Sequence, residues 1–486
     1  MYASIGSASS STLAGDGQHN IHATYLFTFF YWAARSILFQ QVIAGFVFVL
    51  TGSNQPVGIV KGVQGISQLV FSLPAGYIAD HTRRDRVLRF AGVLGLFGSL
   101  LTLIAVMDSS LLLLNVAFAL WGLFDAFQGP AMEAIFAESI PHGRRSYPFM
   151  IKYNVSNLAM VMGPLLSVLL FLYFGDNWRI SELQPVLVLG TILVAISSLV
   201  LFRFDDDKTL LEEDSIHGVQ APADTTEHAA APSSRTSHHR LSLDSDALRT
   251  PSVVGNDLEI EYNYSDDETY DEPTETSKLI HIHPDKEAPI PEATFMGLHS
   301  RHVPHLLFVS DFIISNGAGM TVYFFPLFFK EEYGLSPIHV SLIFLVQPIV
   351  VFVLSYIAQR WSRPLGRMPI VVSTRIFATG CLLWMSFAKP LHLQIVLFLM
   401  RGGMMRCSQP LRRSVLMDHV QKEFRARWNA LEGISVFSYS GSAVLGGYLV
   451  DKYDYRTCFF ITSWVYFAGL ALELFLLPLT KHAIEK

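Results

Sequence analysis

Residues 76–89 read Gly-Tyr-Ile-Ala-Asp-His-Thr-Arg-Arg-Asp-Arg-Val-Leu-Arg, a polar stretch between two apolar segments. The flanking segments, 57–79 and 87–107, are each long enough to cross a bilayer, because a hydrocarbon core of ~30 Å needs about 20 helical residues. The arginines of residues 76–89 cannot remain in hydrocarbon, so this stretch marks a turn at a membrane face. By the positive-inside rule that face is cytoplasmic. The sequence therefore predicts an integral membrane protein.

Composition supports a membrane protein over a set of soluble domains. Of the 486 residues, 51% are hydrophobic and 16% are charged, whereas soluble domains carry about 25% charged residues. The charges are also unevenly spread, since residues 204–300 hold 22 of the 41 acidic residues but 6 of the 35 lysines and arginines. An acidic middle segment thus separates two apolar, basic parts. Three cysteines, Cys381, Cys407 and Cys458, lie in apolar spans, and we expect them to be free buried thiols.

Twelve apolar spans follow one another with short polar breaks. They are residues 22–50, 56–79, 87–107, 110–138, 148–175, 183–203, 303–330, 337–359, 367–388, 391–417, 427–450 and 456–478. Cations cluster beside the even-numbered connections, at Arg83, Arg84, Arg86, Arg89, Arg144, Arg145, Arg360, Arg363, Arg367, Arg412, Arg413, Lys422, Arg425 and Arg427. The odd-numbered connections and their margins offer fewer, at Lys61, Arg179, Lys330, Lys389, Lys452 and Arg456. This asymmetry places both termini on the cytoplasmic side.

The predicted organisation is two six-helix bundles joined by a long acidic segment. Residues 204–302 are rich in Ser, Thr, Asp, Glu, His and Pro and have too few large apolar residues to bury a core, so we expect disorder there. The predicted regions are a disordered cytoplasmic N-terminus (1–21), a first bundle (22–203), a disordered cytoplasmic loop (204–302), a second bundle (303–478) and a cytoplasmic tail (479–486).

The two predicted bundles share a weak internal repeat, at an offset of about 280 residues. The matching stretches are Tyr77–Asp80 with Tyr356–Gln359, Pro130, Glu138 and Arg145 with Pro410, Asp418 and Arg425, and Trp178-Arg179 with Tyr455-Arg456. Each match is weak alone, but all occur in the same order in both halves. Duplicated halves are common in transporters.

The turn and the repeat together resemble the major facilitator superfamily. The family turn between its second and third helices reads glycine, three residues, aspartate and then basic residues, and Gly76, Asp80 and Arg84 occupy these positions. Arg83 stands where the family usually has glycine, and Asp85 where it usually has a second cation. The resemblance implies an all-α membrane protein of twelve helices in two pseudo-symmetric bundles. It also implies a central cavity lined by spans 1, 4, 7 and 10.

Span 5 contains Gly163-Pro164, which looks like the core of the glycine-proline motif of superfamily antiporters. A glycine and a proline inside a helix allow close packing and bending. The flanking glycines of the family motif are absent, because Asn157, Ala159 and Ser167 stand nearby instead. The motif favours antiport, and simple helix packing is the alternative.

Ionisable residues within membrane spans are costly and usually face a partner or a cavity. Arg35 and Asp125 lie at matched depth, about 13 residues or ~20 Å from the cytoplasmic ends of spans 1 and 4, which predicts an ion pair or a substrate site. Asp311 and Arg406 are similarly matched in the second half. The predicted cavity residues are Arg35, Gln40, Gln41, Asp125, Gln128, Glu133, Asp311, Asn316, Arg401 and Arg406. The alternative is that these pairs only hold helices in register.

A carboxylate that gains and loses a proton is the simplest coupling device for a proton-driven carrier. Asp125 and Asp311 are the candidates, with Glu133 as a third nearer the cytoplasmic end. Alternatively, Arg35 and Arg406 hold an anionic substrate, since a guanidinium suits carboxylate or phosphate.

The charged turns also suit a mechanical role, in which ion pairs close the cytoplasmic face and bias the conformational equilibrium. The predicted gating residues are Gly76, Asp80, Arg84, Glu138, Arg145, Asp418 and Arg425. Interfacial charge without a gating role is the alternative.

The predicted function is secondary active transport of a small solute by alternating access, proton-coupled and with a lean to antiport. The alternatives are a uniporter, or a receptor, sensor or scaffold of the same fold acting through the central loop. Residues 206–211 and 275–280 resemble acidic dileucine sorting signals, so adaptors or kinases are candidate partners of the loop, and the plasma membrane or an endosomal, lysosomal or vacuolar membrane is the expected location. We expect a monomer that is not an enzyme, with no cofactor, metal or nucleic acid, because nucleotide-binding, hydrolase and metal motifs are absent.

Overall fold

The computed structural model describes residues 5–140, 146–209, 294–295, 298–420 and 425–480. The first half contains α1 (Ile5–Ser36), η1 (Ile37–Gln41), α2 (Val42–Thr51), α3 (Gln55–His81), α4 (Arg84–Met107), α5 (Leu111–Glu138), α6 (Ser146–Phe174), α7 (Ile180–Val200), η2 (Leu201–Arg203) and η3 (Asp206–Lys208). The second half contains η6 (Ser300–His302), α8 (Val303–Val322), α9 (Phe325–Tyr333), α10 (Pro337–Leu365), α11 (Arg367–Met385), α12 (Leu391–Cys407), α13 (Gln409–Asp418), α14 (Arg425–Lys452), α15 (Tyr455–Leu474) and α16 (Leu476–Leu479). Each of the twelve predicted spans falls on one of these helices or on two or three consecutive ones, so the predicted fold class is confirmed.

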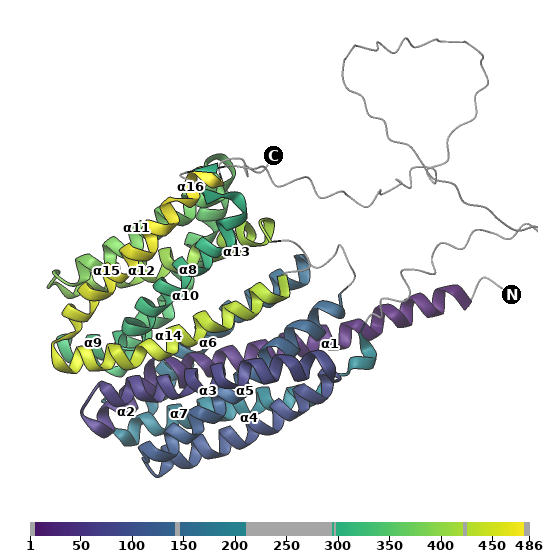
Figure 1. The fold of residues 1–486 in the computed structure, drawn as a ribbon. Helices are drawn as coiled ribbons and strands as arrows, with labels where there is room; N and C mark the ends of the chain where they lie inside the picture. Colours follow the sequence, from purple (N-terminus) through teal and green to yellow (C-terminus); the bar gives the residue numbers. More distant parts are fainter. Residues whose placement is uncertain (1–4, 141–145, 210–293, 296–297, 421–424, 481–486) are drawn as a thin grey trace, which may run out of the picture. The chain divides into compact units, whose positions relative to one another are not determined.

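The two halves pack their helices in the same pattern (Figure 1). In the first half α3 and α4 pack on α5, α6 and α7 pack on α1, and α4 packs on α7. In the second half α10 and α11 pack on α12, α14 and α15 pack on α8, and α11 packs on α15. Each of these helix pairs in the first half thus has a counterpart between the equivalent helices of the second half. The duplication suggested by the sequence repeat is therefore a duplication of architecture.

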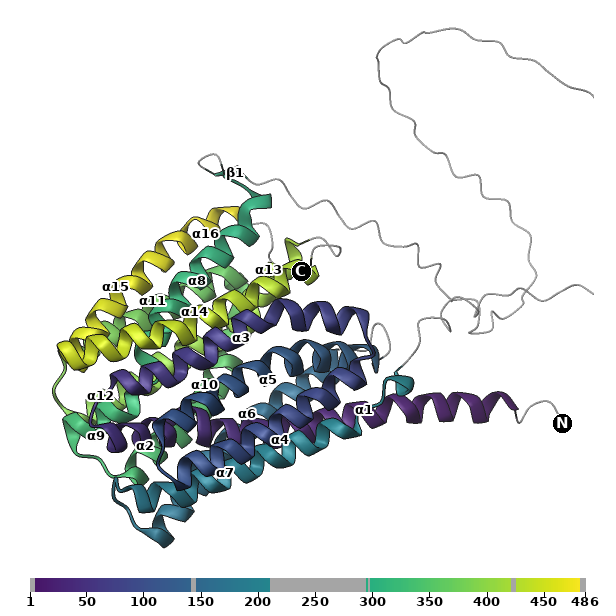
Figure 2. The ribbon, with the colours of Figure 1, turned by 60° about the horizontal axis from the view of Figure 1, so that its bottom comes forward.

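Small residues bring the two halves together. Helix α3 packs on α14, as Figure 2 shows, and α6 packs on α10. A Cβ atom at Gly65 of α3 would lie 2.3 Å from the Cβ of Ser440 on α14, and one at Gly58 would lie 2.3 Å from the carbonyl oxygen of Ala443. Small residues of this kind let helix backbones approach closely in a membrane, where van der Waals packing drives helix association.

Three of the four spans expected around the central cavity are interrupted. Span 1 changes to π-helix over Ile37–Gln41 between α1 and α2. Span 7 breaks between α8 and α9, where Pro326 follows the break, and span 10 breaks at Ser408 between α12 and α13, where Pro410 follows it. Both prolines stand in the first turn of the helix that follows the break, where the backbone N–H that proline lacks would have no partner within the helix. Irregular backbone inside a membrane protein is found where it lines a cavity or is buried in protein.

Nine helices or helix pairs of the described residues are long and apolar enough by composition to cross a membrane. The spans that fall short contain α3, α12 and α14. Helix α12 has only 17 residues, and α3 carries Lys61, Gln64 and Gln68, which face inward rather than toward lipid. Short length in α12 and inward-facing polar residues in α3 therefore explain why these two helices fall short, and neither contradicts the prediction of twelve spans.

The ends of the ordered regions differ from the predictions. Residues 5–21, expected to be disordered, are helical as the start of α1, because extending an already formed helix costs little per residue. The first bundle extends past residue 203, since Phe204 is buried and Asp206–Lys208 form a 3-10 turn. Before α8, Thr294–Phe295 (β1) pair with Leu298–His299 (β2) as a two-residue antiparallel hairpin. The rest of the predicted loop lies outside the described residues. All three cysteines are free and buried, as predicted.

Candidate functional site

A cavity of about 500 Å³ lies between the two halves. Its lining comes from α1, η1, α3 and α6 of the first half and from helices α8 to α15 of the second. The polar and charged lining residues are Arg35, Gln40, Lys61, Gln64, Gln68, Ser156, Asn157, Asp311, Ser315, Gln347, Arg375, Arg401, Arg406, Gln409 and Ser440, and the tyrosines are Tyr153, Tyr323, Tyr439 and Tyr466. The interrupted parts of spans 1, 7 and 10 all reach this space. A volume of this size suits a small organic solute.

In the first half, the predicted pair of Arg35 and Asp125 is present. The Arg35 Nη1 atom lies 3.5 Å from Asp125 Oδ2. Tyr31 connects them, because its hydroxyl donates to Asp125 Oδ1 at 2.5 Å and accepts from Arg35 at 2.7 Å. Gln64 Nε2 donates to the other carboxylate oxygen at 3.2 Å. Arg35 lines the cavity while the Asp125 side chain, 9% exposed, lies behind it.

In the second half, the expected pairing of Asp311 with Arg406 is wrong. Asp311 Oδ1 lies 3.0 Å from Arg412 Nη1 and 3.5 Å from Arg375 Nη2. Arg375 also forms a close ion pair with Glu473 of α15, whose side chain is fully buried. Among the described residues, these two arginines and two carboxylates thus form one network, and the formal charges of the four groups sum to zero. Asp311 thus pairs with Arg375 and Arg412, whereas Arg406 lines the cavity.

Arg401 and Arg406 line the cavity as predicted. Arg401 is 4% exposed, donates to the Tyr466 hydroxyl at 2.8 Å and lies over the ring of Phe325 with its guanidinium carbon 4.8 Å from the ring centroid. Both arginines come from α12, whose end at Ser408 is one of the three interruptions.

Several predicted cavity residues lie elsewhere. Gln40 lines the cavity, but Gln41 is buried and donates to Ser341 Oγ at 3.1 Å. Gln128, Glu133 and Asn316 also do not line the cavity. The Gln128 amide donates to the Met132 sulfur, and the Asn316 amide donates to the carbonyl of Phe312 in its own helix. Glu133 pairs with Lys152, and its side chain is 56% exposed. Glu133 is therefore not among the residues that line the cavity in this structure.

Sequence reasoning missed Lys61, Arg375 and Glu473. Each lies in the interior of a predicted span, and this position was the available signal. Lys61 was counted with the charges at the membrane margin, but it is 2% exposed and lines the cavity. Arg375 and Glu473 are on spans 9 and 12, which the resemblance did not place beside the cavity. Arg412, counted as a loop cation, instead belongs to the network around Asp311.

At one end of the helices the two halves are joined by crossed hydrogen bonds; we call this the capped end, comprising residues 51–55, 175–180, 333–341 and 451–456. The Asp451 carboxylate of α14 accepts from the backbone amides of Asn54 and Gln55, both at 2.8 Å, and from Ser53 Oγ at 2.5 Å. It therefore caps the N-terminus of α3 in the other half. Conversely, Asp176 of the first half accepts from the amide of Ile338, in the first turn of α10, at 2.8 Å.

Two aromatic side chains follow the same crossed pattern at the capped end. Trp178 of the first half donates to the carbonyl of Leu335 at 2.7 Å, and Tyr455 of the second half donates to the Asn54 side chain at 2.9 Å. Trp178 and Tyr455 are matched positions of the sequence repeat. Each half thus sends one aspartate and one aromatic residue to the start of the second span of the other half. These bonds hold the two halves together at the capped end.

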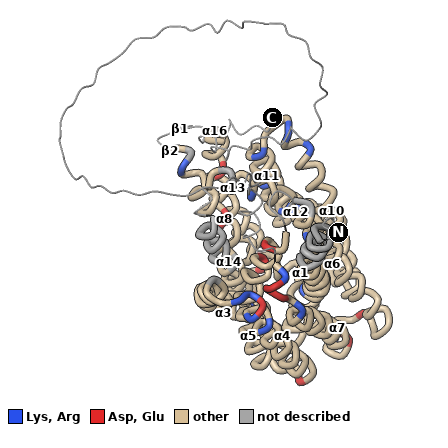
Figure 3. Tube along the Cα trace, turned by 90° about the vertical axis from the view of Figure 1, so that its right-hand side faces the viewer, with Lys and Arg blue, Asp and Glu red and all other residues tan. Residues whose placement is uncertain are grey.

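The opposite end, which we call the charged end, contains residues 81–89, 138 and 203–209. Figure 3 shows blue and red residues gathered there where α1, α3, α4 and α5 meet. Arg84 forms a close ion pair with Glu138, as predicted, but both belong to the first half. Asp85 pairs with Arg83 at 3.2 Å and with Arg89 at 3.1 Å.

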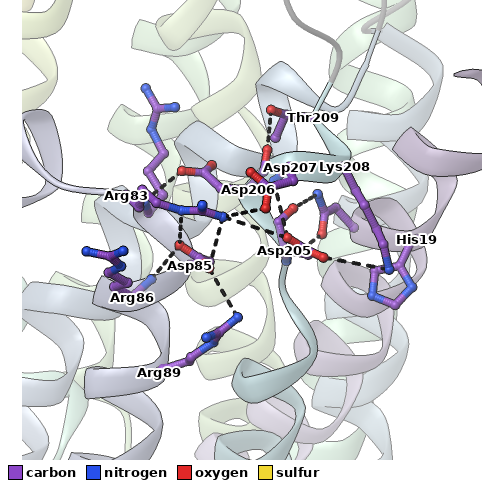
Figure 4. Close-up of polar contacts among 12 residues, drawn as sticks. His19, Arg83, Asp85, Arg86, Arg89, Asp205, Asp206, Asp207, Lys208 and Thr209 are labelled. Atoms are coloured by element: carbon purple, nitrogen blue, oxygen red, sulfur yellow. Dashed lines mark hydrogen bonds and ion pairs between the residues drawn. The ribbon is translucent and has the colours of Figure 1, made fainter.

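The acidic residues that follow span 6 also bind at the charged end (Figure 4). Asp206 accepts from the backbone amide of Arg84 at 3.0 Å and so caps α4, while Asp207 pairs with Arg83 at 2.9 Å. Asp205 exchanges hydrogen bonds with the Asn20 side chain of α1. The acidic part of the first predicted sorting signal is therefore bound to the bundle, while its two leucines lie outside the described residues.

Asp206→Ala should lower the unfolding free energy by about 1 kcal/mol, because it removes the cap of α4. Asp207→Ala is the matched control, since its side chain is 76% exposed and its ion pair is worth little. Thermal unfolding of the two purified variants in detergent measures the difference. Equal midpoints would show that Asp206 does not act as a cap.

Of the remaining predicted motif residues, Gly76, Gly163 and Pro164 are among the described residues. Arg145 and the side chains of Asp80, Asp418 and Arg425 lie outside the described part of the structure. Among the described residues, no neighbouring element lies within 4 Å of the place where a Cβ of Gly76 would stand, so the described packing does not require glycine there. At Gly163, by contrast, a Cβ would lie 1.7 Å from Ser36 Oγ on α1, while α6 continues as helix through Pro164. The packing interpretation therefore accounts for Gly163.

A family model described as Major Facilitator Superfamily matches residues 24–431 and 307–486 of the chain. A relative from Planococcus maritimus, described as a Na(+), Li(+), K(+)/H(+) antiporter, is 35% identical over 163 residues. That match covers 32% of this chain and 36% of the relative, so the chain spans about a third of the relative's length.

Solved structures share the fold at low sequence identity. A bacterial homologue of the human lysosomal transporter Spinster is 12% identical with a TM-score of 0.60, over 97% of this chain and 98% of the other. A bacterial homologue of the iron transporter ferroportin is 11% identical with a TM-score of 0.59, over 94% and 98%. The nucleoside transporter NupG is 12% identical with a TM-score of 0.55, over 94% and 98%. At these identities the likeness shows the fold alone.

Proposed function

Because the chain belongs to the Major Facilitator Superfamily, we propose that it is a secondary transporter that moves a small solute across a membrane by alternating access. Two duplicated halves enclose a cavity with charged walls, and hydrogen bonds join the halves at the capped end. Breaking those bonds and closing the other end exposes the same cavity to the opposite side. In this proposal the arginines of the charged end lie in the cytoplasm and the bonded capped end lies on the opposite side of the membrane.

The observation that carries the proposal is the Arg35–Tyr31–Asp125 cluster. Arg35 faces the cavity and holds Asp125 behind it. We infer that a substrate that draws Arg35 away frees the Asp125 carboxylate, and that this carboxylate is the group that carries the transported proton. Substrate binding and proton binding are thereby linked at one site. The partial relative, a cation/proton antiporter by its description, favours antiport as the form of coupling.

Asp125→Asn should abolish proton movement and leave the fold intact, since asparagine keeps the size and an acceptor for Tyr31 but does not titrate. The experiment reconstitutes the full chain in vesicles containing a pH-sensitive dye and adds Na⁺, Li⁺, K⁺, organic anions and nucleosides in turn. Wild-type protein should respond to one class of solute, and the variant should match protein-free vesicles. Asp108→Asn, an exposed aspartate at the end of α4, is the control and should behave as wild type.

Two results would contradict parts of this proposal. Solute flux that ignores an imposed pH gradient, in wild type and in Asp125→Asn alike, identifies a uniporter and removes proton coupling. If no solute moves in either direction, and deletion of residues 213–289 abolishes the cellular phenotype, the protein is a receptor, sensor or scaffold of the same fold.

A further inference from the structure

The basic side chains in the cavity wall outnumber its carboxylates among the described residues. Among the described residues, Arg35 is paired with Asp125, and Arg375 belongs to the balanced network with Asp311. Three further cations line the same space: Lys61, Arg401 and Arg406. No carboxylate of the described residues forms an ion pair with any of the three. The cavity wall therefore holds three basic side chains that lack a carboxylate partner among the described residues, and a buried charge is costly unless it is paired.

Lys61 is the most confined of the three. Its side chain comes from α3, is 2% exposed and has no hydrogen-bond acceptor among the described residues. The ammonium group lies over the rings of Phe39, Phe118 and Tyr323, at 4.9, 4.9 and 5.1 Å from their centroids. Aromatic faces attract a cation but do not accept the directed hydrogen bonds of an ammonium group. Its donors are left for something that enters the cavity.

Arg401, which lines the cavity from the second half, also has a hydrogen-bond donor without an acceptor among the described residues. One of its terminal nitrogens donates to Tyr466, but its buried Nε has no hydrogen-bond partner in the described structure. A guanidinium presents several donors in a planar fork that matches a carboxylate or a phosphate. Buried polar atoms in native proteins are nearly always satisfied. An unsatisfied buried donor on a cavity wall indicates a ligand with acceptor oxygens.

We propose that the cavity takes a small organic anion, with a carboxylate or phosphate group held by Lys61, Arg401 and Arg406. Its apolar part would lie against Phe39, Phe344 and Phe398, which line the same space. This deepens the proposed function and rests on it for transport, but not for binding. A metal cation as cargo is disfavoured, because it needs oxygen ligands and the one cavity-lining carboxylate of the described residues, Asp311, already binds two arginines.

The test measures binding without transport. Full-length protein in an uncharged detergent is unfolded thermally with sodium benzoate or sodium phenyl phosphate. Benzamide with sodium chloride at matched ionic strength is the neutral counterpart, and lithium and potassium chloride test cations. The organic anions should raise the unfolding temperature, and the neutral amide and the salts should not. Fluorescence of Trp32, which lines the cavity, gives a second readout with 4-nitrobenzoate as quencher and Trp32→Phe as the blank.

Variants assign the effect to the site. Lys61→Met and Arg401→Gln should each weaken the apparent affinity for benzoate by about tenfold or more, as expected for the loss of a hydrogen bond to a charged group. Lys389→Met and Arg360→Gln remove exposed cations of the same types and should leave it unchanged. Without ligand, Lys61→Met should unfold at the same or a higher temperature than wild type, because it removes an unpaired buried charge.

The possible results separate the two proposals. If neither anion binds, if both bind equally well to Lys61→Met and Arg401→Gln, or if only the alkali salts stabilise the protein, the anion site is overturned. Proton-coupled flux in vesicles would then still support the transport proposal. If benzoate binding depends on Lys61 and Arg401 while vesicles show no flux, the anion site is supported and the transport proposal fails.

Discussion

Glu473→Leu should destabilise the protein by about 3–5 kcal/mol, the range observed when one partner of a buried ion pair is removed. Glu473 is fully buried and pairs with Arg375, which is 3% exposed, and its carboxylate also lies 3.9 Å from Arg412 Nε. Without it, Arg375 keeps only the longer contact with Asp311, at 3.5 Å, among its ion pairs with the described residues. The measurement is the midpoint of thermal or denaturant unfolding in detergent, compared with wild type.

The controls for Glu473→Leu test whether the lost stability comes from an unbalanced charge among Asp311, Arg375, Arg412 and Glu473. Combining Glu473→Leu with Arg375→Met leaves the Asp311–Arg412 pair intact and restores neutrality, so most of the lost stability should return. Glu133→Leu removes an acid from an exposed ion pair with Lys152 and should cost no more than about 1 kcal/mol. A double variant as unstable as Glu473→Leu alone would mean that packing, not charge, sets the stability at this position.

The helices were predictable because the bilayer limits what a span can be. A hydrocarbon core requires about 20 helical residues with satisfied backbone groups, so length and low charge located the twelve spans, including three that fall short in length or hydropathy. The pair of Arg35 and Asp125 was also predictable. The helix rise fixes the depth of a residue, and these two residues of opposite charge share one depth on adjacent central spans.

Depth does not fix the direction of a side chain, and this explains the failure at Asp311. The sequence predicts similar depth for Asp311 and Arg406, but Asp311 turns toward Arg375 and Arg412, while Arg406 faces the cavity. The position of Lys61 in the cavity wall was missed for another reason. The family resemblance implied a cavity lined by spans 1, 4, 7 and 10, and Lys61 lies on span 2. The breaks in spans 7 and 10 had a local signal in their prolines, whereas nothing in the sequence of residues 37–41 marks a π-helical turn.

The crossed hydrogen bonds of the capped end were beyond sequence reasoning. They join Asp451 to Asn54 and Asp176 to Ile338, which are far apart along the chain, and no local pattern specifies such pairs. The repeat did identify Trp178 and Tyr455 as equivalent. Their common task, a hydrogen bond to the other half, became visible only with both halves in place.

Removing both crossed aspartate caps, with Asp176→Ala and Asp451→Ala, should open the capped end. Each cap is worth about 1 kcal/mol, and together they shift the ratio of closed to open molecules by about thirtyfold if that free energy is lost only in the closed state. Ser341→Cys reports the change, because Ser341 is buried beneath the caps, where it accepts a hydrogen bond from Gln41. A membrane-impermeant maleimide applied from the capped side should label this cysteine much faster in the double variant.

Asp454→Ala is the matched control for this prediction. Asp454 lies at the same end and caps its own helix α15 by accepting from the amide of Thr457 at 2.5 Å, with no bond to the other half. Its loss should lower the unfolding temperature as a missing cap does, yet leave the labelling rate of Ser341→Cys unchanged. If Asp454→Ala and the double variant accelerate labelling equally, general loosening explains the exposure. If labelling accelerates only when Asp176 and Asp451 are replaced, the two aspartates hold the halves closed. Asp454 is also a helix cap, and it differs from them in that its bond stays within its own half.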